Sequence, residues 1–489
     1  MRSMVEGVAN ANLYGLIAAA ARQAGETPVF VEQGAVRLRY DQLDAAVAGW
    51  AAALHRRGAR PGDRILVQAE KSVEGALLYL ASLRAGLVYV PLNTAYTKAE
   101  VDTFRSDAEP VIAICEGGLD MAALAAQVDL DASFETVARG PGDLAAILYT
   151  SGTTGRSKGA MLSHDNLASN ALVLKDYWRW ETGDVLIHAL PIYHVHGLFV
   201  ALHGALLNGS TMLWHAGFDA GAMIDDMVRA NILMGVPTFY VRLAADPRLT
   251  REIAAGMRLF VSGSAPLLEA TFAAFEAKTG HRILERYGMT EAGMICSNPY
   301  DGDRIPGTVG FALPGIAARV ADKAGREVER GTPGVLEIKG PNLFGGYWRQ
   351  PEKTAEEMRS DGYFITGDLA TMAADGRVAI VGRAKDLIIA GGLNIYPKEI
   401  ELALDAVPGV GESAVIGVPH SDLGEAVVAV VTRTDPALDE AALLAAIAGT
   451  LARFKQPRRI LFADALPRNA MGKVQKAGLR ATYKDLFQT

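Results

Sequence analysis

The segment 149–159 carries a denser set of polar groups than any other stretch of this chain. It reads Tyr-Thr-Ser-Gly-Thr-Thr-Gly-Arg-Ser-Lys-Gly, follows the apolar run 145–149, and precedes a helix expected over 165–174. Glycines leave backbone N–H groups free to surround an anion, hydroxyls donate further hydrogen bonds, and Lys158 adds positive charge. The segment therefore predicts a loop that binds a polyphosphate.

Three other interpretations of this segment are open to the same residues. A solvated turn would have a similar composition. A Walker A loop needs a hydroxyl after the lysine, where this chain has Gly159. A hydrolase nucleophile elbow at Ser157 fits Gly-x-Ser-x-Gly, but five loop-forming residues separate that motif from the strand that should lead directly into it. The phosphate loop is the interpretation we favour.

The bulk properties limit the class of protein. At 489 residues the chain exceeds one ordinary core, so two or more domains are expected. Its net charge of −7 argues against a general nucleic-acid binder. Two cysteines make no disulfide framework, and no apolar run is long enough to span a bilayer. We expect a cytoplasmic protein, monomeric or a loose homo-oligomer, with no nucleic-acid or membrane partner.

The order of predicted elements indicates an α/β fold. Up to about residue 315 strands and helices alternate, as in the strand 64–67 and the helix 73–85, which predicts mostly parallel sheets with helical cover. From Gly315 short alternating runs indicate an antiparallel β-rich subdomain. After Asp386 a smaller α/β pattern resumes. We expect a large N-terminal domain of mixed sheets over 1–384 and a small, mobile C-terminal domain over 385–489.

Four further segments are polar and specific. They are Glu285-Arg286-Tyr287-Gly288-Met289-Thr290-Glu291, Thr366-Gly367-Asp368, Gly382-Arg383-Ala384-Lys385-Asp386 with the following Gly391-Gly392, and Pro467 to Lys473. Each alone is compatible with a surface turn or a structural ion pair. Together with 149–159, and in this order, they resemble the acyl-adenylate-forming superfamily of acyl-CoA synthetases, peptide-synthetase adenylation domains and firefly luciferase. The resemblance covers nearly the whole chain.

The resemblance implies two half-reactions, with ATP, Mg²⁺ and CoA as the small molecules involved. A carboxylate first attacks the α-phosphorus of ATP to give an acyl-adenylate, and a thiol then expels AMP. Preorganised cations and donors aimed at the developing negative charge would supply much of the acceleration. The ATP-binding residues implied are Thr150, Ser151, Gly152, Thr153, Thr154, Gly155, Lys158, Tyr287, Asp368, Arg383 and Lys473.

The same resemblance assigns individual roles. Glu291, with Thr153, would hold Mg²⁺, a hard cation that prefers oxygen ligands. Thr290 would contact the α-phosphate, and Lys473 would bridge the substrate carboxylate and that phosphate. Tyr287 would lie against adenine, Asp368 would accept the ribose hydroxyls, and Arg383 would donate to ribose or phosphate. Lys385 matches the hinge about which the C-terminal domain rotates, which brings Gly391 and Gly392 to the CoA channel.

Within the superfamily the chain looks most like the malonyl-CoA synthetases, on segments 192–199, 236–242, 262–267, 297–300 and 472–476. A dicarboxylate brings a second charge that must be paired when it is buried. Arg286 and Arg242, the latter in what reads as an apolar strand-like run, are predicted to bind the distal carboxylate. His194 or His196 and Ser262 are predicted to assist.

Several alternatives stay open. Arg242 is also compatible with a structural pair to Asp246, and His194 with His196 is weak evidence for a metal site. Val195 and the run 292–296 depart from the group's pattern toward smaller, more apolar residues, so methylmalonate is a second candidate substrate. The rival activities are the adenylation of another small acid, loading of a carrier-protein thiol, a serine hydrolase using Ser157, and a non-catalytic nucleotide binder.

Overall fold

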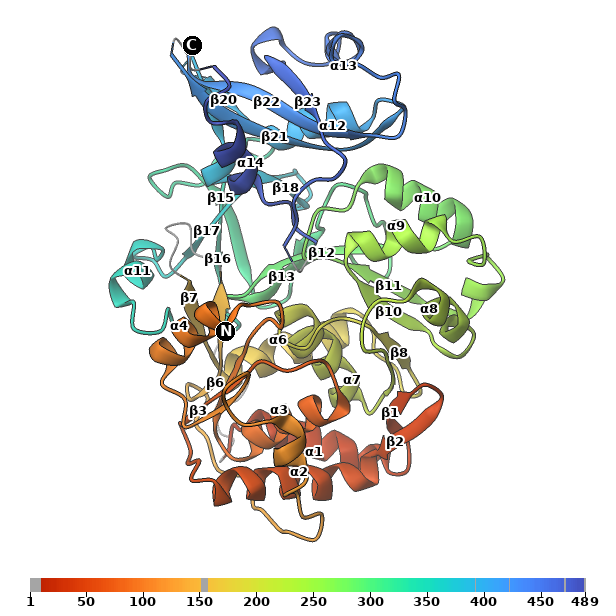
Figure 1. The fold of residues 1–489 in the computed structure, drawn as a ribbon, viewed down its shortest axis with the longest axis vertical. Helices are drawn as coiled ribbons and strands as arrows, with labels where there is room; N and C mark the ends of the chain where they lie inside the picture. The colour runs from red at the N-terminus through yellow and green to blue at the C-terminus, as the bar shows by residue number, and fades with distance from the viewer. Residues whose placement is uncertain (1–9, 151–156, 392, 422, 470–471, 488–489) are drawn as a thin grey trace. The chain divides into compact units, whose positions relative to one another are not determined.

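The structure is a computed structural model that describes residues 10–150, 157–391, 393–421, 423–469 and 472–487. The chain divides into two compact units. The first comprises the residues up to Ala317 together with Lys339–Phe364, and the second comprises Ala318–Ile338 and Ile365–Thr489. The elements of both units can be followed in Figure 1.

The first unit contains two mixed sheets. The larger has nine strands in the order β14 (Phe311–Ala312), β13 (Gly293–Ser297), β12 (Leu284–Met289), β11 (Leu259–Ser262), β10 (Ile232–Gly235), β8 (Val185–His188), β9 (Thr211–Trp214), β1 (Pro28–Glu32) and β2 (Ala35–Arg39). The smaller has the order β5 (Ile112–Ile114), β3 (Arg64–Val67), β4 (Val88–Pro91), β6 (Leu144–Thr150) and β7 (Lys158–Ser163). In the larger sheet the pairs from β12 to β1 are parallel and β2, β13 and β14 are antiparallel.

Helices surround these sheets, as the alternating sequence pattern predicted. They are α1 (Leu13–Ala24), α2 (Tyr40–Arg56), α3 (Val73–Arg84), α4 (Lys98–Ala108), α5 (Met121–Ala125), α6 (His164–Tyr177), the π-helix η1 (His196–Ala201), α7 (Leu202–Asn208), α8 (Ala220–Asp226), η2 (Met227–Arg229), α9 (Pro237–Ala245), η3 (Ile253–Gly256), α10 (Glu269–Thr279) and α11 (Pro351–Glu356). The predicted helix 165–174 is α6. It begins at a capping box in which the Ser163 hydroxyl accepts from the Asn166 N–H and the Asn166 side chain accepts from the Ser163 N–H.

The second unit contains the turn-rich β region and the C-terminal α/β region. A four-stranded sheet has the order β15 (Ala317–Ala321), β16 (Gly334–Lys339), β17 (Phe364–Met372) and β18 (Val378–Arg383). A five-stranded sheet contains β19 (Ile388–Ala390), β20 (Leu393–Ile395), β21 (Val410–His420), β22 (Gly424–Arg433) and β23 (Arg459–Phe462). The helices are η4 (Ala384–Asp386), α12 (Pro397–Asp405), α13 (Glu440–Ile447), η5 (Arg453–Lys455) and α14 (Lys476–Tyr483).

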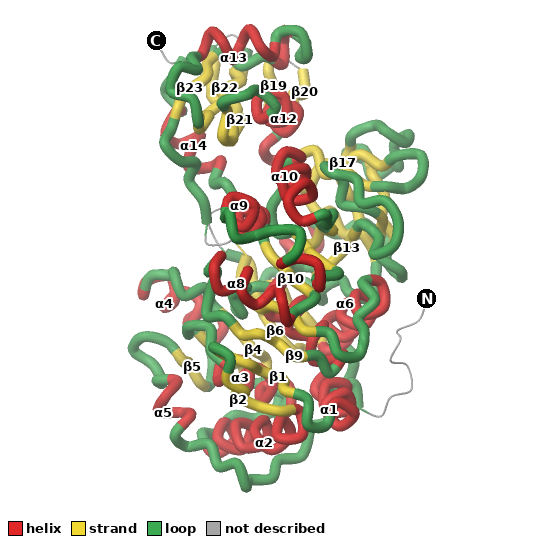
Figure 2. Tube along the Cα trace, turned by 90° about the vertical axis from the view of Figure 1, so that its right-hand side faces the viewer, coloured by secondary structure: helices red, strands yellow, loops and turns green. Residues whose placement is uncertain are grey.

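The five-stranded sheet is covered by helices on both faces, with α13 and α12 beside it in Figure 2. One core cluster joins Val415 of β21 to Ile400 of α12 and Leu443 of α13. The other joins Ile416 of β21 to Leu479 of α14. Because successive residues of a strand point to opposite faces, α12 and α13 cover one face and α14 covers the other. The mixed α/β architecture is therefore confirmed, whereas the division into domains 1–384 and 385–489 stays a prediction.

None of the helices in the described part of the chain is long and apolar enough to cross a membrane.

Candidate active site

The predicted phosphate loop is the connection of a β-hairpin. Thr150 ends β6 and Lys158 begins β7, and the two residues face each other in the antiparallel register. Residues 151–156 lie outside the described residues, so the predictions for Ser151, Gly152, Thr153, Thr154 and Gly155 are untested. Ser157 precedes a strand, whereas a nucleophile elbow needs a serine between a strand and a helix. A Walker A loop likewise leads into a helix.

Lys158 is held by a segment nearly two hundred residues away in the sequence. Residues 345–348 run along β7: the Trp348 N–H donates to the Gly159 carbonyl at 2.7 Å, and the Gly345 N–H donates to the Met161 carbonyl at 3.0 Å. This pairing brings the Tyr347 hydroxyl within 3.1 Å of the Lys158 Nζ. Gly159 permits the approach, since a Cβ there would lie 3.3 Å from the Cβ of Trp348 and 2.9 Å from a methyl of Ile147.

Two carboxylates complete this cluster. Lys158 Nζ lies 3.0 Å from Glu357 Oε1, and the Tyr347 hydroxyl lies 2.7 Å from Glu357 Oε2 and 2.9 Å from Glu291 Oε1. A hydroxyl has one hydrogen, so Tyr347 donates to only one of the two carboxylates at a time. Burial raises the pKa of Glu291, and the hydrogen bond from Tyr347 with the charge of Lys158 opposes that rise only in part.

Glu291 fits the predicted role of a magnesium ligand. Its carboxylate is 6 % exposed and lies in surroundings that do not fully compensate its charge. Among the described residues no three His, Cys, Asp or Glu side chains are grouped closely enough to hold a metal ion. Mg²⁺ at nucleotide sites needs only one or two carboxylates, because substrate phosphates and water supply the other oxygens. A single buried glutamate near the phosphate loop suits that chemistry.

A second cluster lies at the carboxyl edge of the nine-stranded sheet, where ligands of such sheets usually bind. Ser262 ends β11, and its Cα is paired in register with Glu285, the residue before Arg286 on β12. The Arg286 guanidinium lies directly over Gly263, where a Cβ would come within 2.3 Å of the guanidinium carbon. Only glycine at this position leaves room for the arginine.

Arg286 is a buried cation with no carboxylate partner among the described residues. It is 4 % exposed, and its Nε and Nη2 have no hydrogen-bond acceptor among the described residues. Burial lowers the pKa of Arg286 to about 9, because removing a cation from water disfavours the charged form. Buried arginines are normally paired, so this arrangement points to an anion that comes from outside the protein.

The positive charge of Arg286 affects the imidazole of His196. Burial and then the charge of Arg286 lower the pKa of His196 well below its usual range, so the imidazole is neutral. Its Nδ1 lies 3.3 Å from the Ser264 hydroxyl, while its Nε2 has no partner among the described residues. The Ser262 hydroxyl is buried and has none either. Two neutral side chains that can donate hydrogen bonds, those of His196 and Ser262, therefore belong to the same cluster as the Arg286 guanidinium.

The backbone around His196 is held in uncommon conformations. His196 begins the π-helix η1, a form that occurs frequently at functional sites. Ser264, which contacts His196, has a φ of 71°. A non-glycine residue in that region costs of order 1–3 kcal/mol, and such strain concentrates at active sites. The His188 ring nitrogen Nε2 lies 3.0 Å from the Gly197 carbonyl and ties η1 to the end of β8.

The predictions for Arg242 and His194 have different outcomes. The strand-like reading of Arg242 is wrong, because the residue lies on the helix α9, which begins with Pro237 at its first position. Its side chain is exposed and lies over the Phe218 ring at 5.4 Å. Asp246 pairs with Arg248 instead. His194 is half-buried, and its Nδ1 accepts from the His196 N–H at 3.3 Å.

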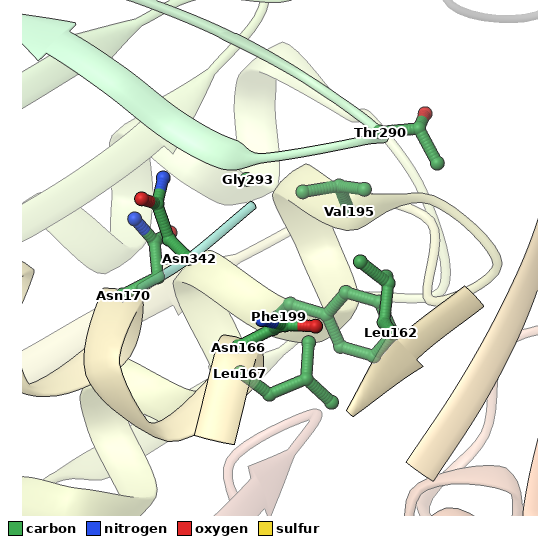
Figure 3. Close-up of a pocket in the computed structure, with 9 residues that line it drawn as sticks. All are labelled: Leu162, Asn166, Leu167, Asn170, Val195, Phe199, Thr290, Gly293 and Asn342. Atoms are coloured by element: carbon green, nitrogen blue, oxygen red, sulfur yellow. The ribbon is translucent and has the colours of Figure 1, made fainter. Parts of the chain in front are cut away.

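A small cavity adjoins these residues (Figure 3). It offers about 10 Å³ to the centre of a water molecule, enough for one water-sized group. Its lining comprises Leu162, Asn166, Leu167, Asn170, Val195, Phe199, Thr290, Gly293 and Asn342. Val195 immediately precedes His196, and Thr290 immediately precedes Glu291. The cavity is therefore lined by the sequence neighbour of one residue from each cluster.

The second unit contains the predicted residues from Asp368 onward. Asp368 and Arg383 are partners in the β17–β18 register, with Arg383 Nε 3.0 Å from the buried Asp368 carboxylate. Burial and then the charge of Arg383 lower the pKa of Lys473 to about 8. Burial and then Arg383 also lower the pKa of Lys385, which lies in η4. Gly391 has a φ of 57° at the β19–β20 turn, whereas Gly392 lies outside the described residues.

The comparisons with known proteins agree with this arrangement. A model of the AMP-binding enzyme family matches residues 17–348, and a model of the AMP-binding enzyme C-terminal domain matches 399–473. The chain belongs to the AMP-binding enzyme family. The structure is similar to the crystal structure of ATP-bound MatB from Rhodopseudomonas palustris, with a TM-score of 0.94 and 53 % identity over 98 % of this chain and all of that one.

Curated relatives of this AMP-binding enzyme include CoA ligases for different acids. A feruloyl-CoA synthase from Amycolatopsis sp is 36 % identical over 93 % of this chain and 95 % of its own length. A malonate–CoA ligase from Arabidopsis thaliana is 34 % identical over 88 % of this chain and 79 % of its own length. The AMP-binding enzyme is thus an ATP-dependent acid–thiol ligase with CoA as a substrate. The alternative interpretations as a serine hydrolase using Ser157 and as a non-catalytic nucleotide binder are therefore wrong.

The AMP-binding enzyme also contains site residues that sequence reasoning missed. Tyr347 and Glu357 contact Lys158. The Arg286 guanidinium packs against the backbone of Gly263. Gly263 lies within the segment 262–267, and a glycine permits close approach of another group to the backbone. Tyr347 and Glu357 had no comparable signal, because the pairing of 345–348 with β7 is visible only in the fold.

Proposed function

We propose that the protein joins malonate to CoA through a malonyl-adenylate, releasing AMP and pyrophosphate. The observation that carries this proposal is the buried guanidinium of Arg286, two of whose nitrogens, Nε and Nη2, lack acceptors among the described residues. An acid that is activated through one carboxylate and carries a second one would supply the missing anion. The similarity to MatB and to a malonate–CoA ligase supports the same substrate class.

The proposed chemistry divides between the two units. In the first unit Arg286, with His196 and Ser262, holds the distal carboxylate, so the proximal carboxylate is oriented toward the nucleotide. Lys158 and Thr150 hold phosphates, and Glu291 holds Mg²⁺, which would neutralise charge on the phosphates. In the second unit Asp368 and Arg383 bind the ribose, and Lys473 bridges the reacting carboxylate and the α-phosphate. Rotation about Lys385 then exchanges Lys473 for Gly391 and its neighbour.

Arg242 is a weaker member of the proposed substrate set. Its side chain is exposed and lies over an aromatic ring, so its charge is screened by water. We propose that Arg242 attracts the dianion toward the site and does not pair with it in the pocket. Methylmalonate is the second candidate substrate, because the cavity beside Val195 has room for about one small group.

The test is pyrophosphate release with acetate, propionate, malonate, methylmalonate, succinate and ferulate, each with and without CoA. We expect malonate to give the highest kcat/KM, with methylmalonate within about 200-fold, since one methyl is worth about 1–3 kcal/mol. Product analysis should find malonyl-CoA when CoA is present. Ready use of acetate or ferulate with no turnover of malonate would refute the proposal.

A further inference from the structure

The Lys158 side chain is fixed on two sides before any nucleotide arrives. Its Nζ lies 3.1 Å from the Tyr347 hydroxyl and 3.0 Å from Glu357 Oε1, and it lies 4.2 Å from the centre of the Tyr347 ring. An ammonium group has three N–H donors, so these contacts use two and leave one. A free lysine side chain loses up to about 2 kcal/mol of rotamer entropy when it is ordered. Here that ordering is done by the protein itself.

The two partners come from one short, well-anchored segment. Ala160 of β7 forms an isolated antiparallel bridge with Tyr347, and the Tyr347 N–H donates to the Thr354 hydroxyl at 2.9 Å. Glu357 directly follows α11, which starts at Pro351. The distance between Tyr347 and Glu357 is therefore set by one helix and its preceding turn.

Glu357 keeps its negative charge in this position. Burial acts to raise its pKa, but hydrogen bonds from Tyr347 and Lys158 outweigh burial and hold the pKa below its usual range. Lys353 Nζ lies a further 3.2 Å from Glu357 Oε1. A charged carboxylate close to a phosphate site repels a nucleotide, so it is an unfavourable choice for binding ATP alone.

We infer that Tyr347 and Glu357 are positioning residues for the adenylation step. They hold Lys158 so that its remaining N–H donor meets the leaving phosphates of ATP in one fixed geometry. The inference rests on the proposed function, in which Lys158 binds those phosphates. Its cost is electrostatic repulsion in the ground state, and its benefit is an oriented cation where charge develops in the transition state.

This division of roles predicts opposite effects on binding and on rate. In Glu357→Gln the repulsion disappears, but the neutral amide oxygen holds Lys158 less firmly than the carboxylate did. ATP should therefore bind at least as tightly as to the unaltered protein, while kcat for pyrophosphate release falls by about 10- to 100-fold, as for a misplacement of about 1 Å. A residue that only supports the fold would weaken both together and lower the melting temperature.

Glu356→Gln is the matched control, since Glu356 is exposed and bonded to Lys353 but not to Lys158. Equilibrium ATP binding and single-turnover pyrophosphate release should be measured for both variants, with the acid that the unaltered protein activates best. We expect Glu356→Gln to stay within about twofold in both quantities. A kcat for Glu357→Gln within twofold of the unaltered protein, or weakening of ATP binding in proportion to kcat, would overturn the inference.

Two further variants cover the remaining outcomes. Glu357→Asp keeps the charge but withdraws it by one methylene, so it should show the same loss of kcat and serves if the glutamine variant does not fold. Lys158→Met tests the role on which the inference rests. If Lys158→Met leaves pyrophosphate release unchanged, the phosphate-binding role in the proposed function fails. If it abolishes release while both Glu357 variants are fully active, only the positioning role fails.

Discussion

Replacing Arg286 by methionine should remove the use of malonate and leave the fold intact. Two of the guanidinium nitrogens, Nε and Nη2, find no acceptor in the described part of the protein. A hydrogen bond to a charged group is worth about 1.5–3 kcal/mol, so two such bonds to a carboxylate amount to about 3–6 kcal/mol. Since about 1.4 kcal/mol corresponds to a factor of ten, kcat/KM for malonate should fall by about 10²- to 10⁴-fold.

The same change should make the ligand-free protein more resistant to heat. Arg286 is 4 % exposed, and burial lowers its pKa to about 9 because the cation lacks a counter-charge. Replacing buried charges by apolar side chains of similar volume is often neutral or stabilising by about 1–4 kcal/mol. The variant should melt no lower than the unaltered protein, and malonate should no longer raise its melting temperature.

The assay combines pyrophosphate release with thermal unfolding and direct ATP binding. ATP affinity should be unchanged, because Arg286 does not contact Lys158 or Glu291 in the structure. Arg242→Met provides the comparison, and its exposed position limits the expected loss to less than about tenfold. A malonate kcat/KM for Arg286→Met within tenfold of the unaltered protein would refute the reasoning, and so would a larger effect at Arg242.

Three other outcomes are expected. Burial lowers the pKa of Lys473 to about 8, and only the charged form of Lys473 can bridge two anions. The kcat/KM for adenylation should therefore fall above about pH 8, whereas thioester formation from preformed malonyl-adenylate should not show this fall. Burial raises the pKa of Asp405 to about 6, so the stability it contributes is lost as pH rises from about 4 to about 6. Asp405→Asn should therefore melt higher than the unaltered protein by a margin that widens over that range and then stays constant, with about 3 kcal/mol as an upper bound. Val195→Leu should fill the cavity and reduce kcat/KM for methylmalonate by at least about tenfold relative to malonate, and equal losses for both acids would contradict this role.

The sequence predicted the elements well where a local pattern decides them. The strand 64–67 and the helix beginning at Val73 lie where hydrophobic periodicity placed them. The polar segment 285–291 was recognised from residue types alone, and the structure places Arg286 on β12 and Glu291 just beyond its end. Such segments can be read from the chain because all their information lies within a few residues.

Contacts between distant segments could not be predicted in the same way. Nothing local pairs Lys158 with Tyr347, which are 189 positions apart, or places Gly263 beneath Arg286. The strand β7 was also missed, because its short apolar run follows the glycine-rich loop directly. The error at Arg242 had a visible cue, since Pro237 is favoured in the first turn of a helix and excluded from a central strand. The apolar character of the run around Arg242 was given too much weight there.

The unpaired state of Arg286 also explains how a pocket of this kind would reject monocarboxylates. Propionate has the same three-carbon chain as malonate, but its methyl group offers no acceptor and would leave the Arg286 Nε and Nη2 unsatisfied. A buried polar group left without its partner costs about 1–3 kcal/mol, and more if it is charged. Selectivity then comes from the hydrogen-bond donors that the wrong substrate leaves without an acceptor.

In Arg286→Met that penalty disappears. The ratio of kcat/KM for malonate to kcat/KM for propionate should therefore fall, because the value for malonate decreases and the value for propionate increases. A ratio that stays unchanged, with both acids losing activity equally, would mean that Arg286 supports the fold of the pocket and does not read the second carboxylate.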